Sequence, residues 1–462
     1  MTAEHRNHAR GARRPEWIPV KAFACAILIG TLLLMLPWSR AGGGWTAPLP
    51  ALFTATSATC VTGLIVVDTG SYFSHFGQLV ILCLMQIGGL GIMTMGTFFL
   101  ILIGRRLRVR DEFVLMDSLG SDHVRGLRSL MWHAFIFAML FEASAAAVLA
   151  HRLVAVHGYP TGRAVYVGLF HAVSAFCNAG FSLFADSLMG LRTDPVVVWT
   201  VIGLIVIGGL GFLVLYNLTH VRWWSRNRLR RGRLSLHTKL VLSASLFLVL
   251  FMWTAFLVLE WGNTLAPLPW THKLNAALFQ AVTPRTAGFN VVDMAAVQPA
   301  TRFLTMLMMF VGGSPGSTAG GIKTTTVFVM LATVFAMIKA RDETDIFGRT
   351  ISTRVVREAL SIFILGVFCV LVAFGILLVS EHALCLLGSQ SRPEALLFET
   401  ISAIGTVGLS TGITARLSFV GKLCIIVSMF IGRLGPMTIA LIIGGKESVT
   451  AIRYPEEEVV VG

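Results

Sequence analysis

The stretch Phe53-Thr-Ala-Thr-Ser-Ala-Thr-Cys-Val-Thr-Gly63 occurs three more times in this 462-residue chain, each time in a varied form. A phenylalanine opens every copy, a serine or threonine follows four residues later, and a glycine closes it. The other copies run from Phe170 to Gly180, from Phe279 to Gly288 and from Phe398 to Gly408. The third copy is one residue shorter. Because the spacing of more than 100 residues is too long for a solenoid, it predicts four copies of one larger unit.

The composition around these copies is that of an integral membrane protein. Hydrophobic residues make up 55% of the chain and charged residues only 13%, against roughly 25% charged residues in soluble domains. A soluble enzyme and a disordered protein are therefore excluded. Apolar runs long enough to cross a bilayer are expected at 18–38, 77–103, 130–152, 195–218, 238–261, 302–338, 356–380 and 418–444.

Each copy of the motif falls between the two apolar runs of one pair. The predicted fold is an all-α polytopic membrane protein with four tandem helix–re-entrant pore helix–helix repeats around a pseudo-fourfold pore. Two spans per unit return the chain to the same side, so the copies are parallel. The expected units are an N-terminal tail at 1–17, pore repeats at 18–104, 127–220, 236–340 and 354–446, and a C-terminal tail at 447–462.

The lysines and arginines give the orientation. Twenty-five of the 37 lie in the tails and in the loops that join one repeat to the next, whereas nine lie in the loops that carry the motif. Because basic residues concentrate in cytoplasmic loops, both termini are predicted in the cytoplasm. The same asymmetry accounts for the formal charge of +14, so no nucleic acid partner is expected. The basic run from Arg226 to Arg233 suits contact with anionic membrane lipid.

The motif suits the passage of a cation. A short helix that ends inside the membrane aims the partial negative charge of its last carbonyls at the centre. The extended stretch behind it offers carbonyl oxygens in place of the hydration shell of an ion, and glycine permits the required backbone angles. The alternative is that the glycines only allow close helix packing. Packing alone does not explain why each glycine follows a segment too short to span.

An enzyme is not expected. The run from Gly316 to Thr324 nearly matches a phosphate-binding loop, but Ile322 puts the spacing off by one residue and no strand precedes it. The seven cysteines are scattered and none forms a C-x-x-C pair, so neither zinc nor a disulfide framework is indicated. No organic cofactor is predicted for the chain.

Taken in order, the motifs resemble those of the Trk/Ktr/HKT superfamily of cation transporters. The resemblance covers nearly the whole chain and is greatest for the membrane subunits of the bacterial KtrB branch, because only one span precedes the first motif glycine. It rests on five segments: Ser57–Leu64, Ser174–Phe181, Thr283–Asn290, Ser402–Gly412 and Gly312–Thr324.

The resemblance implies uptake of potassium along the pseudo-fourfold axis. Four filter glycines favour K⁺, since members with serine at the first of these positions tend to carry sodium. Two side chains, Asn178 and Arg285, depart from strict fourfold symmetry. A dependence on Na⁺, a sodium-permeable member and a coupled symporter with an occluded site stay open as alternatives. The implied potassium-binding filter comprises Val61, Thr62, Gly63, Asn178, Ala179, Gly180, Thr286, Ala287, Gly288, Thr406, Val407 and Gly408.

The sixth apolar run is too long and is broken in its middle. Glycines and a proline at 312–321 cannot continue a helix, so helical halves are expected at 302–311 and 322–338. The resemblance implies an intramembrane gate here, with loop 312–323 hydrogen-bonded to a basic residue of the last span; the alternative is that this residue only holds helix-end carbonyls. The gate residues would be Gly312, Gly313, Ser314, Pro315, Gly316, Ser317, Thr318, Ala319, Gly320, Gly321, Lys323 and Arg433.

The resemblance also implies the partners and the location. A homodimer in the bacterial cytoplasmic (inner) membrane is expected to sit on a cytosolic, KtrA-like ring of nucleotide-binding subunits that controls the gate. The basic inner loops suit such docking, although they would look the same as topology signals alone. The sequence of this chain does not specify which nucleotide those cytosolic subunits bind.

Overall fold

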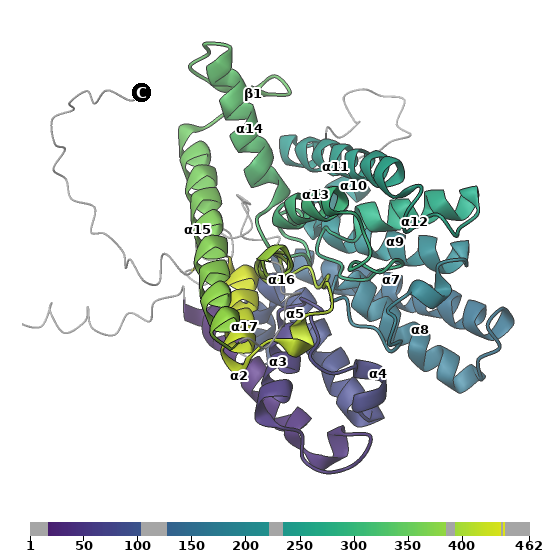
Figure 1. Ribbon diagram of the computed structural model, residues 1–462. Coiled ribbons are helices and arrows are strands. Elements are labelled where there is room, and N and C mark those ends of the chain that lie inside the picture. The colour runs from purple at the N-terminus through teal and green to yellow at the C-terminus, as the bar shows by residue number, and fades with distance from the viewer. Residues whose placement is uncertain (1–16, 103–126, 221–233, 385–392, 436–437, 439–462) are drawn as a thin grey trace, which may run out of the picture.

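The computed structural model describes residues 17–102, 127–220, 234–384, 393–435 and 438. This part of the chain is almost entirely helical (Figure 1), which confirms the predicted class. The exception is a small antiparallel hairpin of β1 (Thr344–Ile346) and β2 (Arg349–Ile351) between two long helices. The predicted tails and the ends of several predicted repeats lie outside the described residues.

Long helices alternate with short ones along the chain. The long or broken ones are α2 (Trp17–Met35), α5 (His75–Leu102), α7 (Leu127–Ala155), α9 (Pro195–Leu210) with α10 (Phe212–His220), α11 (Leu236–Glu260), α13 (Pro299–Phe310) with α14 (Thr324–Ile338), α15 (Thr353–Leu384) and α17 (Phe419–Leu434). The short ones are α3 (Pro48–Thr59), α8 (Thr161–Phe176), α12 (Trp270–Val282) and α16 (Pro393–Gly405). A single turn, α4 (Thr69–Tyr72), precedes α5.

Among the described residues, three helical stretches are long and apolar enough to cross a membrane: Ala134–Ala155, Leu236–Glu260 and Thr353–His382. The pair α9 and α10 would be a fourth if it counts as one span. Shorter apolar helices lie at Pro19–Met35, His75–Gly91 and Thr324–Ile338. Large apolar side chains on the long helices, among them Leu32, Leu246 and Val379, are exposed, as expected for surfaces that face lipid.

The apolar run 195–218, predicted as a span, is not one straight helix. The helix breaks at Gly211, where φ is +90°, and α10 leaves α9 at an angle of 95°. The break has a tertiary cause, because the amide freed at Phe212 donates to the carbonyl of Gly316 at 3.0 Å. A side chain at position 211 would also meet the Pro315 carbonyl oxygen, 2.7 Å from its Cβ. The neighbouring loop therefore occupies the space that a straight continuation of α9 would need.

The predicted interruption of the sixth span is present. Helix α13 ends at Phe310 and α14 begins at Thr324, with no helix between them. The two ends of the interruption pair with each other: Gly312 N donates to Ile322 O at 2.8 Å, and Thr324 N donates to Gly313 O at 3.0 Å. These bonds close 312–323 into a compact loop, which we call the intramembrane loop.

The C-terminal halves of the four short helices lie in the interior of the molecule. Each is anchored by the phenylalanine that opens its motif, and all four of these side chains are at most 1% exposed: Phe53, Phe170, Phe279 and Phe398. In Figure 1, α3 and α16 lie among the long helices of the first and last units. The segments that follow the short helices, which carry the motif glycines, are therefore brought into the protein core.

Candidate functional site

The four motif glycines meet in one closed ring. A Cβ on any of them would lie 2.9 Å or less from a carbonyl oxygen of another unit, so each glycine is required by the close approach of a neighbouring backbone. The order of contacts returns to its start: Gly63 faces the carbonyl of Ala179, Gly180 that of Ala287, Gly288 that of Val407, and Gly408 that of Thr62. We call this set of eight residues the glycine ring.

The backbone is strained at the same place in all four units. The glycines have φ values of +70° to +90°, and the residue two positions earlier is also left-handed. These earlier residues are Val61 (φ +55°), Asn178 (+57°), Thr286 (+71°) and Thr406 (+50°). A β-branched residue with positive φ is a genuine outlier, and such strain persists only where the surroundings impose it. The recurrence marks the ring as a site rather than a set of loops.

The hydroxyl residue of each motif holds the ring segment to its short helix. The amides of Thr62, Ala179 and Val407 donate to carbonyls five residues earlier, at Ser57, Ser174 and Ser402 (2.7–2.8 Å). In the shorter third copy, Ala287 N donates to the carbonyl of Thr283, four residues earlier, at 2.9 Å. The missing residue is thus absorbed by a tighter turn, and the ring position is kept.

The side chains of the same residues add a second tie. Ser174 Oγ donates to Phe181 O at 2.8 Å and Thr283 Oγ1 to Phe289 O at 2.5 Å, while Ser402 Oγ accepts from Gly408 N at 3.1 Å. The Ser57 hydroxyl has no partner in the structure. The recurring serine or threonine is therefore explained in three of the four units by a bond across the ring segment.

The oxygens at the ring suit a monovalent cation. Besides the ring carbonyls, four completely buried side-chain oxygens of these segments have no hydrogen-bond partner: Thr62 Oγ1, Asn178 Oδ1, Thr286 Oγ1 and Thr406 Oγ1. Buried polar atoms without a partner require an explanation, and a passing ion that replaces its water with protein oxygens supplies one. Within the described residues, no group of three or more His, Cys, Asp or Glu side chains could hold a metal ion.

The intramembrane loop lies against the ring and the second unit. Ser314 N donates to Gly209 O at 3.2 Å, and Thr318 N donates to Gly208 O at 3.3 Å. On its other side, Gly321 N donates to Gly432 O at 3.4 Å. A Cβ on Gly320 would collide with the side chain of Thr406, a residue of a ring segment. The loop is therefore held between the second and fourth units, beside the ring.

Arg433 links the intramembrane loop to the first unit. The side chain is 2% exposed, and its guanidinium donates to the carbonyl of Thr318 in the loop and to the carbonyl of Gly88 in α5. The family resemblance implied the contact with the loop. Nothing in the sequence around Arg433 indicates the contact with α5. Lys323 stays within the loop, where Nζ donates to Ala319 O at 2.7 Å.

Arg285 does not line the ring, although it lies inside the third motif. Its guanidinium turns outward and donates to Ser245 Oγ of α11 at 2.9 Å. Glu142 is not among the residues that the sequence singled out. The structure places this carboxylate of α7 against Gln86 of α5, whose amide donates to both of its oxygens at 3.1 and 3.2 Å, and Cys177 Sγ donates to Gln86 Oε1 at 3.4 Å. This polar cluster lies directly behind the second ring segment.

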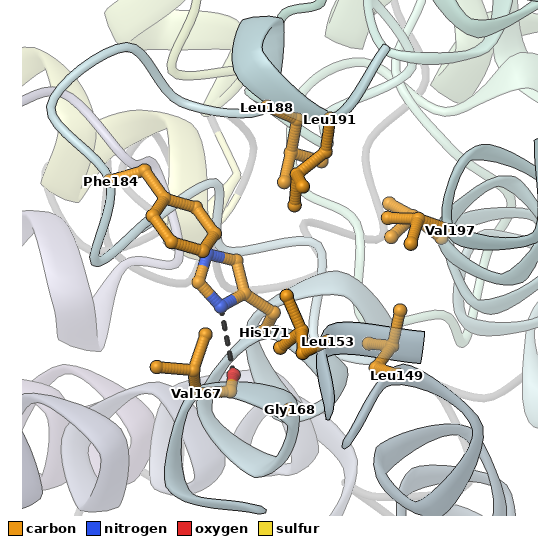
Figure 2. A pocket seen from close by; sticks show the side chains of 10 residues that line it. Leu149, Leu153, Val167, Gly168, His171, Phe184, Leu188, Leu191 and Val197 are labelled. Carbon is orange, nitrogen blue, oxygen red and sulfur yellow. Dashed lines mark hydrogen bonds between the residues drawn. The ribbon is translucent and has the colours of Figure 1, made fainter. Parts of the chain in front are cut away.

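A small apolar pocket lies beside α8 (Figure 2) and does not belong to the ring. Its histidine, His171, bonds through Nδ1 to Val167 O at 2.8 Å and stacks on Phe184 with ring centroids 4.9 Å apart. The bond lies within α8, and the stacking joins α8 to the segment that follows it. Both contacts indicate a structural role for His171 rather than a role as a ligand.

Comparisons with known proteins agree on one family. Residues 2–447 match the family model TrkH, described as "Cation transport protein". The chain is 41% identical to Ktr system potassium uptake protein B of Bacillus subtilis and 37% identical to potassium/sodium uptake protein NtpJ of Enterococcus hirae, over 97% of both chains in each case. The fold matches the crystal structure of the potassium transporter TrkH from Vibrio parahaemolyticus with a TM-score of 0.68 at 17% identity, covering 94% of this chain and 86% of that one.

Proposed function

Because the chain belongs to the TrkH family of cation transport proteins, we propose that it takes up potassium across the bacterial cytoplasmic membrane, with the glycine ring as its selectivity filter. The observation that carries this proposal is the closed cycle in which each motif glycine faces a carbonyl oxygen of the next unit. The relative with 41% identity is named a potassium uptake protein of a Ktr system. The filter would comprise the residues at and just before the four glycines, from 61–63, 178–180, 286–288 and 406–408.

The filter would select by coordination. K⁺ loses its hydration shell only where a full set of oxygens replaces it. The ring offers backbone carbonyls from four units, and the C-terminal ends of the four short helices add partial negative charge. No carboxylate is needed, so an ion would bind weakly enough to leave. Channel-like passage is favoured over an occluded symport site because the oxygens are those of a backbone ring.

The intramembrane loop would be the gate. It lies beside the ring, and hydrogen bonds to the second and fourth units hold it there. The guanidinium of Arg433 is buried on the same side without a carboxylate partner among the described residues, and its charge opposes a cation that leaves the filter. Backbone and guanidinium bonds position the loop, and a regulator could shift such a two-state element by a few kcal/mol of differential binding.

The regulator would be a cytosolic, nucleotide-binding subunit, and the membrane subunit would act as a homodimer. The support for this part is the similarity to subunits of Ktr systems, including Ktr system potassium uptake protein D of Bacillus subtilis at 33% identity. The basic loops between repeats would face the cytoplasm and supply the docking surface. Both termini would lie on the same side.

The test is ion flux into proteoliposomes that contain the purified chain. We expect ⁸⁶Rb⁺ uptake that external K⁺ competes for strongly and Na⁺ weakly, with and without Na⁺ in the buffer. Protein-free liposomes and liposomes with the Gly63→Ser variant are the controls. Absence of K⁺-competed uptake by folded protein, both alone and with a cytosolic partner, would contradict the proposed function.

A sodium-permeable transporter is the second candidate, because NtpJ is named a potassium/sodium uptake protein. The same competition experiment separates the two. Equal inhibition of ⁸⁶Rb⁺ uptake by Na⁺ and K⁺ would favour this candidate over a potassium-selective filter. A stimulation of uptake by Na⁺ without competition would instead indicate that sodium activates the transporter.

A further inference from the structure

Asn178 occupies a filter position whose backbone does not require asparagine. Asparagine tolerates a left-handed φ better than most residues, which by itself would explain its presence. However, the equivalent positions carry Val61, Thr286 and Thr406, which are β-branched and yet left-handed. Since even these residues adopt the conformation, the amide of Asn178 has a use other than backbone geometry.

The amide reaches the intramembrane loop. Asn178 Nδ2 donates to Thr318 Oγ1 at 3.2 Å, across 140 residues of sequence. The Thr318 hydroxyl in turn donates to the carbonyl of Phe176, the last residue of α8, at 3.2 Å. Both side chains are completely buried. The single hydroxyl therefore joins the loop to the filter segment and to the short helix behind it.

The other three equivalent residues make no such bond. Val61 has no polar side-chain atom, and the hydroxyls of Thr286 and Thr406 have no hydrogen-bond partner. Thr406 touches the loop only through packing against Gly320. Among these four residues, all of them described by the structure, the direct side-chain bond from filter to loop is thus confined to the second unit.

Thr318 is the most constrained residue of the intramembrane loop. Its amide donates to Gly208 O at 3.3 Å, its carbonyl accepts from Arg433, and its hydroxyl bonds to Asn178 and Phe176. A loop that leaves the pore must break all of these bonds. The Asn178 amide would then lie in the filter without its partner, which is costly at a buried site.

We propose that Asn178 is a positioning residue that latches the intramembrane loop shut through Thr318 and so couples the filter to the gate. This proposal rests on the proposed function of the ring and loop. The latch favours the closed loop, and it links the loop position to the filter position. Loss of the bond should raise basal flux by about threefold to tenfold, the population shift that one hydrogen bond of ordinary net strength supports.

The test uses four variants in proteoliposomes without cytosolic partner. Thr318→Val removes the hydroxyl at nearly constant volume, and Thr318→Ser keeps it. Asn178→Thr installs the residue found in the third and fourth units, where the left-handed backbone accepts it. Thr254→Val removes an exposed hydroxyl that bonds only within α11. ⁸⁶Rb⁺ flux, its competition by K⁺ and Na⁺, and the melting temperature in detergent are measured for each variant and for the Asn178→Thr/Thr318→Val double variant.

We expect raised flux for Thr318→Val and Asn178→Thr, and flux close to that of the parent for Thr318→Ser and Thr254→Val. The double variant should be no faster than the faster single one, because both single variants remove the Asn178–Thr318 bond. The ion preference of Thr318→Val should be that of the parent. Additive effects, or an Asn178→Thr change confined to ion preference, would overturn the latch. Arg433→Gln distinguishes a failure of the latch from a failure of the proposed gate. If it raises flux while Thr318→Val does not, only the latch is wrong. If neither variant raises flux, the loop is not the gate.

Discussion

At the scale of single residues, the strictest demands fall on the motif glycines. Gly63 has a φ of +86°, and a Cβ there would lie 2.5 Å from the Ala179 carbonyl oxygen. A side chain must therefore displace this carbonyl of the glycine ring. We expect Gly63→Ser to lower the preference for K⁺ over Na⁺ by about tenfold, equivalent to about 1.4 kcal/mol of differential binding, in a competition assay of ⁸⁶Rb⁺ uptake.

The chain offers a matched control for this variant. Gly44 has nearly the same φ, +82°, but no atom within 4 Å of its added Cβ. Gly44→Ser therefore carries the backbone strain without the collision. It should keep the ion preference of the parent. An unchanged preference in folded Gly63→Ser would mean that the ring does not select the ion.

Arg433 is the second residue on which function is expected to depend. Its two hydrogen bonds to the carbonyls of Thr318 and Gly88 are made by a charged donor, a class worth about 1.5–3 kcal/mol each. Arg433→Gln, which is shorter and neutral, should release the intramembrane loop and raise flux without partner by about tenfold or more. A variant shortened within 313–321 should behave in the same way, and both should keep their preference for K⁺.

The exposed Arg416 provides the comparison, since Arg416→Gln removes the same charge at the surface, where no hydrogen bond to the loop is recorded for its side chain. Flux is to be measured on purified protein reconstituted alone. If Arg433→Gln and the shortened loop both stay as slow as the parent while folded, the barrier lies elsewhere in the chain.

At the scale of elements, a buried carboxylate joins the two long helices of a unit. In the third and fourth units it lies at the C-terminal end of the first long helix, α11 or α15. Glu260, the last residue of α11, accepts from Gln298 N (2.8 Å) and Thr301 Oγ1 (2.6 Å) at the start of α13. Glu381 of α15 accepts from Ser418 Oγ at 2.7 Å, directly before α17. In the second unit the carboxylate lies on the later helix instead: Asp194 at the start of α9 accepts from Arg152 of α7.

We expect Glu260→Ala to destabilise the fold. The carboxylate also accepts from Asn263 and Thr264, so its loss leaves several donors unpaired, at a cost of about 2–4 kcal/mol. The melting temperature in detergent should fall clearly. Glu358→Ala, which removes an exposed partner of Arg354 on α15, should leave it nearly unchanged. A similar effect of both variants would contradict the role of Glu260.

A described helix ends at the same position in two of the units. Gly211 and Gly435 each lie three residues after the glycine that packs on a short helix, and their angles agree (φ +90°, ψ 142° and φ +88°, ψ 138°). In the first unit, α5 runs through Gly91 without a break. The second unit differs because its freed amide has an acceptor in the intramembrane loop, at Gly316.

Gly211→Ala should therefore loosen the intramembrane loop. Alanine is strained at this φ, by roughly 1–3 kcal/mol, and its Cβ would meet the Pro315 carbonyl. Raised ⁸⁶Rb⁺ flux without partner is the expected result. Gly203→Ala on the same helix meets no atom within 4 Å and has an ordinary helical backbone, so it should leave flux unchanged. Equal flux in the two variants would show that the break at Gly211 does not support the loop.

At the scale of the whole molecule, the arrangement predicts which surfaces share a side of the membrane. Trp45 and Phe347 are both exposed, at 67% and 56%. Trp45 precedes a short helix, and Phe347 lies in the β1–β2 hairpin between two units. Trp45→Cys should be labelled by an impermeant maleimide from outside intact cells, and Phe347→Cys only from inside-out vesicles, each above the labelling of the parent chain. Labelling of both from the same side would contradict the parallel arrangement of units.

The ring itself is a property of the whole molecule, because each of its contacts joins different units. The fourfold pattern is also broken at this scale. A loop interrupts the third unit, an arginine stands in the fourth where the others have glycine, and an asparagine bonds the loop from the second. A symmetric filter has no part that differs from the others, so the proposed gate would be built from these departures.

The amino-acid sequence by itself determined the helical membrane class, the four short segments with their glycines and the interruption at 312–321. These features are local: composition, apolar length, glycine and proline act on the residues that carry them. Only the tertiary structure decided the closure of the ring, the bend at Gly211, the outward turn of Arg285 and the partners of Arg433 and Asn178. Arg285 depends on Ser245 of its own unit, 40 residues away. The others depend on a neighbour in another unit, such as Thr318 at 140 residues from Asn178. A periodic pattern gives the face or end on which a residue lies, but the identity of a distant partner follows only from how the units pack.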